Sequence, residues 1–173
     1  HRGPVVSLEH RLLYDIRFPA SSGPGPSNPL SSRLIRAGRD LTVVASSIMV
    51  LEAQRAARHL AEYGIDMEII DLHTPSHYNG GMIIESLRKT GRLLVADTSW
   101  LPYGVSAEIS RVVVESDPGV LRAPARFLGM QWAPCPTAKT LEDLFYPNLR
   151  DFVDTAAALV RGRGDHGVPL PDE

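Results

Sequence analysis

The stretch Lys89-Thr-Gly-Arg-Leu-Leu-Val-Ala-Asp97 decides the fold. After Arg92 it is apolar as far as Ala96, as expected of a strand that is buried on both faces of a sheet. Gly91, just before this run, is the residue type that most often ends a helix. The stretch therefore predicts a helix that ends near Gly91, followed by a central strand of a parallel sheet.

A regular alternation of strand-like and helix-like segments continues on both sides of this strand. Short β-branched runs alternate with longer segments in which apolar residues recur every three or four positions. We expect strands at 33–36, 41–45, 67–71, 92–96 and 125–128, and helices at 53–64, 83–91, 105–115 and 147–160. The turn at 38–40 could join the first two strands in a hairpin. The alternation predicts a three-layer α/β/α fold around a mostly parallel sheet.

The two ends of the chain have a different composition. Residues 4–8 predict a short strand that leads into an extended arm, and residues 19–29 form a Pro/Ser/Gly linker. From Gly162 onward we expect a flexible tail, because the residues are mostly Gly, Pro and Asp. The sequence begins at His1 without a methionine or a signal segment, so we expect a truncated chain or a proteolytic fragment.

Composition limits the classes of function. A chain of 173 residues that is 43% hydrophobic can bury one core, and a net charge of -2 argues against nucleic-acid binding. No apolar run approaches the length of about 18 residues that a membrane helix needs. Cys135 is the only cysteine, so an intramolecular disulfide is impossible and a reducing compartment is expected.

No catalytic or metal-binding motif is complete. The glycine-rich phosphate loops and the Gly-x-Ser-x-Gly turn of hydrolases are absent, and Gly80-Gly81 is better read as a flexible turn. His73 and His77 flank Thr74-Pro75, which argues against a shared helical face and favours surface positions. Cys135 is interpreted as structural, because a reactive thiolate would need a nearby cation or a helix N-terminus.

Aromatic residues in predicted loops are more informative. Trp100, Tyr103 and Trp132 all lie outside the predicted helices. Such residues are often the anchors of a protein interface. They could equally be lids over the core, and the sequence leaves both interpretations open.

Five segments together resemble a known family. They are Pro4-Val-Val-Ser-Leu-Glu-His-Arg-Leu-Leu-Tyr14, Gly38-Arg-Asp-Leu-Thr-Val-Val-Ala45, Lys89-Thr-Gly-Arg-Leu-Leu-Val-Ala-Asp97, Tyr103-Gly-Val-Ser-Ala-Glu-Ile109 and Leu141-Glu142. In this order and spacing the chain resembles the C-terminal part of the β subunit of thiamine diphosphate-dependent 2-oxo-acid dehydrogenases, which is built like the transketolase C-terminal domain. The resemblance implies a five-stranded mixed sheet whose first strand is antiparallel to the rest.

The same resemblance implies a division of labour in a longer protein. A preceding domain would bind the pyrimidine half of thiamine diphosphate, with Mg, and carry the catalytic histidine. Residues 1–18 would be the end of that domain, 19–29 a linker, 30–161 the transketolase C-terminal-like domain and 162–173 a tail. The parent enzyme would decarboxylate a 2-oxo acid or transfer a two-carbon ketol unit. This chain would supply subunit association, with no catalytic, cofactor-binding or metal-binding residue of its own.

The resemblance also implies partners. We expect a homodimer or an α2β2-type assembly, an α subunit and, in some assemblies, a lipoyl acyltransferase, in the cytoplasm or, in a eukaryote, the mitochondrial matrix. The interface candidates are Trp100, Tyr103, Gly104 and Glu108, with Glu142, Asp143 and Tyr146 as an acidic surface for a basic acyltransferase-binding domain.

Several positions depart from the family pattern. His77-Tyr78-Asn79 stands where a Pro-Leu-Asp turn is usual, so Asn79 would take over the N-capping role of the aspartate. Asp97 replaces a glutamate, while Trp132 and Thr137 replace an aspartate and a tyrosine. These changes suggest a divergent, transketolase-like branch and leave the substrate open.

A second hypothesis is a free-standing module that binds a small metabolite or anion. Its pocket would lie at the carboxyl ends of the parallel strands, lined by Ser46, Ser47, His73 and Asp97. A complete enzyme within this chain is the third hypothesis.

Overall fold

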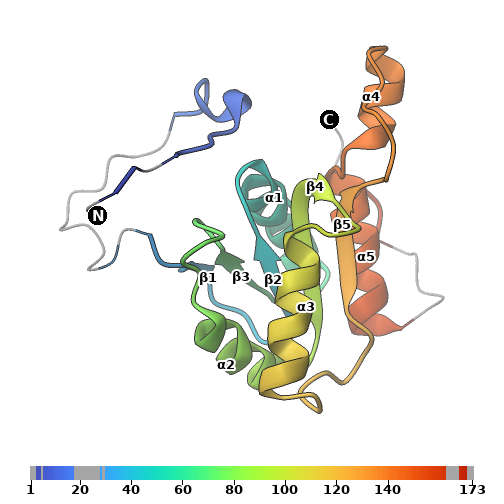
Figure 1. Ribbon diagram of the computed structural model, residues 1–173. Helices are drawn as coiled ribbons and strands as arrows, with labels where there is room; N and C mark the ends of the chain where they lie inside the picture. Colours follow the sequence, from blue (N-terminus) through green and yellow to red (C-terminus); the bar gives the residue numbers. More distant parts are fainter. Residues whose placement is uncertain (1–2, 5, 18–27, 29, 163–167, 171–173) are drawn as a thin grey trace.

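A five-stranded mixed sheet forms the centre of the molecule in the computed structural model (Figure 1). The structure describes residues 3–4, 6–17, 28, 30–162 and 168–170. The strands are β1 (Arg33–Arg36), β2 (Leu41–Ala45), β3 (Met67–Asp71), β4 (Leu93–Trp100) and β5 (Arg126–Met130). The helices are a 3-10 turn (Arg11–Leu13), α1 (Ile48–Glu62), α2 (Gly80–Thr90), α3 (Val105–Ser116), α4 (Lys139–Phe145) and α5 (Leu149–Arg161).

The strands lie in the order β1-β3-β2-β4-β5. Strands β2 to β5 are parallel and β1 is antiparallel to them, as the family resemblance implied; the strand that β1 pairs with is β3. The predicted hairpin is therefore wrong, because β3 lies between β1 and β2. The turn after β1 crosses the start of β3 instead: a Cβ on Gly38 would lie only 2.3 Å from the backbone nitrogen of Glu68.

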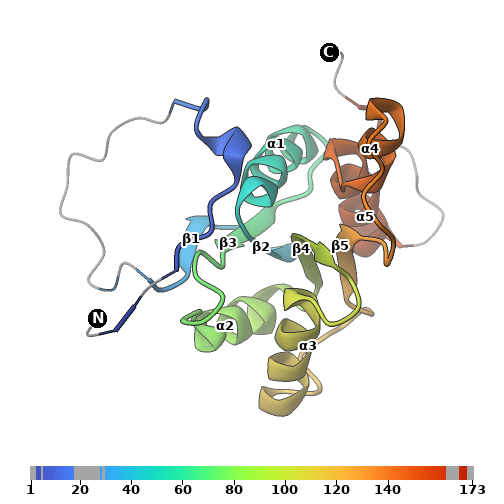
Figure 2. The same cartoon turned by 45° about the horizontal axis from the view of Figure 1, so that its top comes forward.

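Helices cover both faces of the sheet (Figure 2). Helices α1 and α5 pack on one face in a core that includes Ala53, Ala56, Ala57 and Phe152. Helices α2 and α3 pack on the other face around Ile83, Leu87 and Ile109. The small alanines of α1 are fully buried, which lets this helix approach the sheet closely. The predicted three-layer α/β/α fold is confirmed.

The ends of α2 agree with the sequence. The Asn79 side chain accepts a hydrogen bond from the Met82 backbone N–H at 3.1 Å, so its predicted capping role is confirmed. Gly91 ends the helix in the left-handed conformation, with φ of 66°. Both ends are fixed by local chemistry, which is why sequence could locate them.

Other elements depart from expectation. Residues 4 and 6–8 form no strand, and Val6 and Leu8 are almost fully exposed. Helix α4 was not predicted, while α5 begins at Leu149 because Asn148, and not Pro147, makes the cap. Most of the predicted linker and part of the predicted tail lie outside the described residues. Within the described part of the chain, no helix is both long enough and apolar enough to cross a membrane.

Candidate interface beside the carboxyl ends of β4 and β5

The loop between β4 and α3 is held in an unusual conformation. The Leu101 backbone N–H donates to the Met130 carbonyl at 3.0 Å, which keeps the start of the loop beside β5. Tyr103 then adopts a positive φ of 63°, which is strained for a bulky residue. Gly104 is required next, because a Cβ there would lie 2.2 Å from the Trp100 carbonyl oxygen. The backbone therefore directs the tyrosine ring outward.

Three aromatic residues gather at this point. The ring centroids of Trp100 and Trp132 are 4.6 Å apart, and those of Tyr103 and Trp132 are 6.1 Å apart. The exposed fractions are 43% for Trp100, 92% for Tyr103 and 63% for Trp132. We call these three residues the aromatic cluster. Neither buried core contains any of them, which argues against the interpretation as core lids.

The two segments that carry the cluster contain no charged residue, although Asp97, Glu108, Arg126 and Lys139 flank them in the sequence. Residues 98–107 and 127–138 include no Asp, Glu, Lys, Arg or His, although 22% of the whole chain is charged. Exposed loops normally contain charged residues, and protein interfaces are depleted of them at their centre. The absence of charged residues from these two segments is visible in the sequence, but a search for motifs does not detect it.

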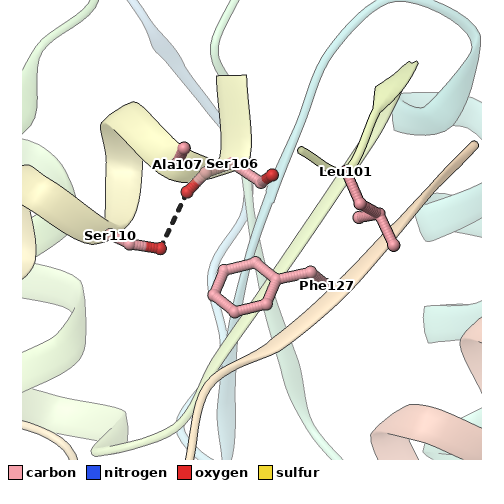
Figure 3. Close-up of a pocket in the computed structure, with 5 residues that line it drawn as sticks. All are labelled: Leu101, Ser106, Ala107, Ser110 and Phe127. Carbon is pink, nitrogen blue, oxygen red and sulfur yellow. Dashed lines mark hydrogen bonds between the residues drawn. The ribbon is translucent and has the colours of Figure 1, made fainter. Parts of the chain in front are cut away.

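A small open cavity lies between α3 and β5 (Figure 3), and its lining includes Leu101, the residue after Trp100. Its volume is about 180 Å³, and its lining consists of Leu101, Ser106, Ala107, Ser110 and Phe127. Figure 3 shows the Phe127 ring extending from β5 toward α3. From the sequence, Ser106 was interpreted as a capping or packing serine and Ala107 as inward-facing, whereas the structure leaves Ala107 exposed, and no binding role was predicted for any of the five.

Glu108 is engaged within the chain. The Tyr78 hydroxyl donates to its carboxylate at 2.7 Å, and the Arg111 guanidinium donates to it at 2.7 Å and 2.8 Å. The Arg111 hydrogen bonds and then the Tyr78 bond lower the pKa of Glu108 to about 2. Burial and the Glu108 carboxylate raise the pKa of Tyr78 to about 12. Glu108 thus ties α3 to the loop before α2, directly after the first of the two uncharged segments.

The acidic candidates lie on α4, which projects from the body of the molecule (Figure 1). Lys139 Nζ lies 3.4 Å from the Glu142 carboxylate and 2.6 Å from that of Asp143, so the negative charge is partly neutralised. Tyr146 receives a hydrogen bond from the Cys135 thiol at 3.5 Å between sulfur and oxygen. Leu141 and Leu144 leave an exposed apolar side on this helix.

Two of the four residues proposed for the alternative pocket, Ser46 and Asp97, are in contact. Ser46 Oγ donates to Asp97 at 2.6 Å, and Ser99 Oγ donates to the other carboxylate oxygen at 2.5 Å. His73 instead contacts Arg33, with 3.1 Å between nitrogens, and its backbone N–H donates to Asp71. The cavity beside α3 includes none of the four proposed residues.

The described residues do not fit a cofactor site. None of them form a group of three or more His, Cys, Asp or Glu side chains that could hold a metal ion. The sequence also lacks a phosphate-binding loop. We therefore derive no chemical step through thiamine diphosphate or Mg in this chain.

Fold and surface together define the class: a three-layer α/β/α domain with an exposed aromatic cluster. The chain belongs to the transketolase C-terminal domain family, since the model described as "Transketolase, C-terminal domain" matches residues 31–151. It is 32% identical over 163 residues to the β subunit of acetoin:2,6-dichlorophenolindophenol oxidoreductase of Cupriavidus necator, covering 94% of this chain and 48% of that protein. The family resemblance seen in the sequence is confirmed.

Two further relatives agree. The mitochondrial pyruvate dehydrogenase E1 component subunit beta-1 of Arabidopsis thaliana is 38% identical over 154 residues, covering 87% of this chain and 42% of that protein. The solved structure "Split gene transketolase, inactive beta4 tetramer" has the same fold, with a TM-score of 0.67, 24% identity, and coverage of 85% of this chain and 44% of that one. The chain thus spans about half the length of the curated relatives it matches.

Proposed function

We propose that this chain is the association domain of a thiamine diphosphate-dependent β subunit or of a transketolase-like enzyme. The observation that carries the proposal is the exposed aromatic cluster on two segments that contain no charged residue, in a member of this domain family. Aromatic residues at the centre of an uncharged patch are the usual anchors of protein interfaces. The cluster would bind another subunit, with Gly104 shaping the loop and Glu108 at the rim.

The relatives support a proposal for the chemistry of the parent enzyme. They include an acetoin oxidoreductase β subunit and pyruvate dehydrogenase β subunits, which supports a parent that acts on a 2-oxo acid or a related ketone. Thiamine diphosphate, with Mg, would bind to parts of the assembly other than the described residues. Residues 1–18 would end the preceding domain, and residues 30–161 would be the association domain.

The proposed partners of the parent are a second β chain and an α subunit, in an α2β2-type assembly. A lipoyl acyltransferase could meet Glu142, Asp143 and Tyr146, although Lys139 reduces the negative charge there. The mitochondrial names of the plant relatives support a matrix location in a eukaryote, and otherwise the cytoplasm is proposed.

Sedimentation velocity over a wide concentration range tests the association role. The chain should self-associate. Trp132→Ala should raise the dissociation constant of the self-association by about tenfold or more, as expected for an interface anchor. Tyr63→Ala is the matched control, because Tyr63 is a partly exposed aromatic residue at the C-cap of α1 whose ring contacts that of His59. A strictly monomeric chain, or equal effects of the two variants, would refute the proposal.

A further inference from the structure

Residues 168–170, near the C-terminal end of the sequence, pack onto the body of the molecule, although the sequence predicts a flexible tail from Gly162 onward. Val168 is 4% exposed and belongs to the buried cluster that α1 and α5 form on one face of the sheet. Leu170 packs against the same cluster, whereas Pro169 between them is exposed. Val168 is therefore a buried anchor in a segment that otherwise lies at the surface.

One hydrogen bond fixes the backbone of this segment. The Pro169 carbonyl oxygen lies 2.5 Å from His59 Nε2 on α1, and because a carbonyl can only accept, the imidazole donates. Within the described part of the chain, no other hydrogen bond joins residues 168–170 to the body of the molecule. The segment is held by buried side chains and one carbonyl, as a short bound peptide would be.

The site that receives the segment is built by elements that do not depend on it. The Arg161 guanidinium, at the end of α5, donates to the Tyr63 carbonyl at the end of α1, with 2.8 Å between the atoms. This bond joins the two helix ends one turn away from His59, whose ring contacts the Tyr63 ring at 5.1 Å between centroids. Leu60 of α1 is fully buried in the same cluster as Val168. We therefore expect a groove to remain between α1 and α5 when the segment leaves.

The sequence of the segment suits binding without prior folding. Proline has a fixed φ and favours an extended conformation in the residue before it, so Val168 is held extended before it docks. An extended segment that contains proline loses little conformational entropy when it binds. Val168 and Leu170 thus present two apolar side chains on a backbone that is already close to its bound conformation.

The short tether indicates how tightly the free segment should bind. Val168 follows Gly162, the C-cap of α5, by six positions. A binding segment on so short a tether has an effective concentration in the millimolar range. A segment that occupies its site at this concentration should bind as a free peptide with a dissociation constant of about 1 mM or tighter.

We propose that α1 and α5 form a docking groove for a short, extended Val-Pro-Leu peptide, and that residues 168–170 of the same chain are its detachable occupant. Val168 fills the apolar part of the groove, and His59 recognises the carbonyl of the proline. The proposal is independent of the association role, because the aromatic cluster takes no part in these contacts.

The test uses the full-length chain with Val168→Asp, in which the occupant no longer fits. A charge in the apolar part of the groove is unfavourable, so the segment should leave and the groove should become free. The synthetic peptide Gly-Val-Pro-Leu-Pro, which copies residues 167–171, should then bind with a dissociation constant of about 1 mM or tighter. NMR titration measures this through the signals of the His59 ring. The native chain should bind the same peptide several-fold more weakly, because its own segment competes.

Matched variants identify the contacts. The peptide with Asp in place of Val168 should bind about tenfold or more weakly than the native peptide. His59→Ala, added to the Val168→Asp chain, should weaken binding of the native peptide by about fivefold, as expected for one lost hydrogen bond. Arg58→Ala, at an exposed neighbouring site on α1, should leave the affinity unchanged. If the Val168→Asp chain binds neither peptide, or both equally, the groove is refuted.

Thermal unfolding gives a second readout on the same chains. Val168→Asp should lower the melting temperature by about 5 °C or more, because a buried valine is lost, whereas Val6→Asp, at a position that is 84% exposed, should not. The native peptide should restore part of the loss, since a ligand of the folded state stabilises it. Val168→Ser replaces Val168→Asp if circular dichroism shows that the latter does not fold. If neither variant folds, Val168 is an integral part of the core and a detachable occupant is refuted.

Discussion

The two ends of the sheet differ in what they bury: one buries polar residues with hydrogen-bond partners, and the other leaves aromatic residues exposed. Near the amino ends of β2 and β3, Thr42 and Glu68 are buried, and each has hydrogen-bond partners on other elements. Near the carboxyl ends of β4 and β5, the aromatic cluster is exposed to solvent. At the first end, the buried polar groups find their hydrogen-bond partners within the same chain. At the second end, the aromatic surface is buried only when another surface covers it. We propose that the difference separates stability from association in this fold.

Glu68 is the centre of the buried end. Its carboxylate accepts a hydrogen bond from the Gly38 backbone N–H at 3.1 Å and pairs with Lys89. Burial alone would raise the pKa of Glu68, but the hydrogen bonds from Lys89, Ser86 and Gly38 outweigh it and lower the pKa. The charged form is therefore the one that the fold stabilises.

The largest effect is expected from Lys89→Met. Removing one partner of a buried ion pair leaves a charge without compensation, which costs about 3 kcal/mol. Because Lys89 is itself half-exposed, we expect the free energy of unfolding to fall by about 2 kcal/mol, less than for a fully buried pair. Urea unfolding at neutral pH measures this.

Arg88→Met is the control for this prediction. Arg88 is the preceding residue on α2, and its ion pair with Asp117 is solvent-exposed. Exposed pairs contribute at most about 1 kcal/mol. Equal losses in the two variants would show that the buried end is no more important for stability than the surface.

The hydroxyl cluster beside Glu68 should give the next effect. Thr42 Oγ1 lies 2.6 Å from both Ser86 Oγ and Thr90 Oγ1, and all three residues are buried. Thr42→Val keeps the shape but leaves the two α2 hydroxyls with one partner fewer, at a cost of about 1–2 kcal/mol. Urea unfolding should show this loss, while Thr140→Val, at an exposed site on α4, should show almost none.

Acid should weaken the buried end as well. A carboxyl whose pKa is lower in the folded chain than its ordinary value of 4.5 stabilises the fold above that value, and the stabilisation is lost as the pH falls toward the folded pKa. The urea midpoint should therefore decrease below about pH 4.5, and less steeply in Glu68→Gln. Parallel curves for the two chains would show that other carboxylates cause the acid loss.

The sequence predicted what local chemistry determines. Asn79 and Gly91 fix the ends of α2 through their own side chain and backbone, and the apolar run up to Ala96 required a buried strand. The pairing of β1 with β3 was missed, because strand order depends on contacts between residues far apart in the chain. The hairpin seemed plausible only because Gly38 stands in a turn, although this turn crosses β3 instead.

The candidate site could be predicted only in part. Trp100, Tyr103 and Trp132 were singled out as loop aromatics, and the structure brings all three together. The cavity was missed because Phe127 and Ser106 come from separate elements and look like ordinary strand and helix residues. Helix α4 was missed because its apolar residues Leu141 and Leu144 do not face the core, so no long apolar period marks it.

The smallest expected effect on stability lies at the exposed end, and it has the opposite sign. Tyr103→Asn relieves a left-handed backbone conformation that costs a bulky residue about 1–2 kcal/mol. It loses one edge contact with Trp132, worth about 0.5 kcal/mol, and almost no burial, since Tyr103 is nearly fully exposed. The unfolding free energy should therefore rise by about 0.5–1 kcal/mol. Tyr14→Asn, at an exposed site with φ of -68°, should give no such gain. A variant that is more stable as a chain but weaker as a dimer would show that the strain at Tyr103 serves association, whereas a destabilised Tyr103→Asn would show that the ring stabilises its own chain.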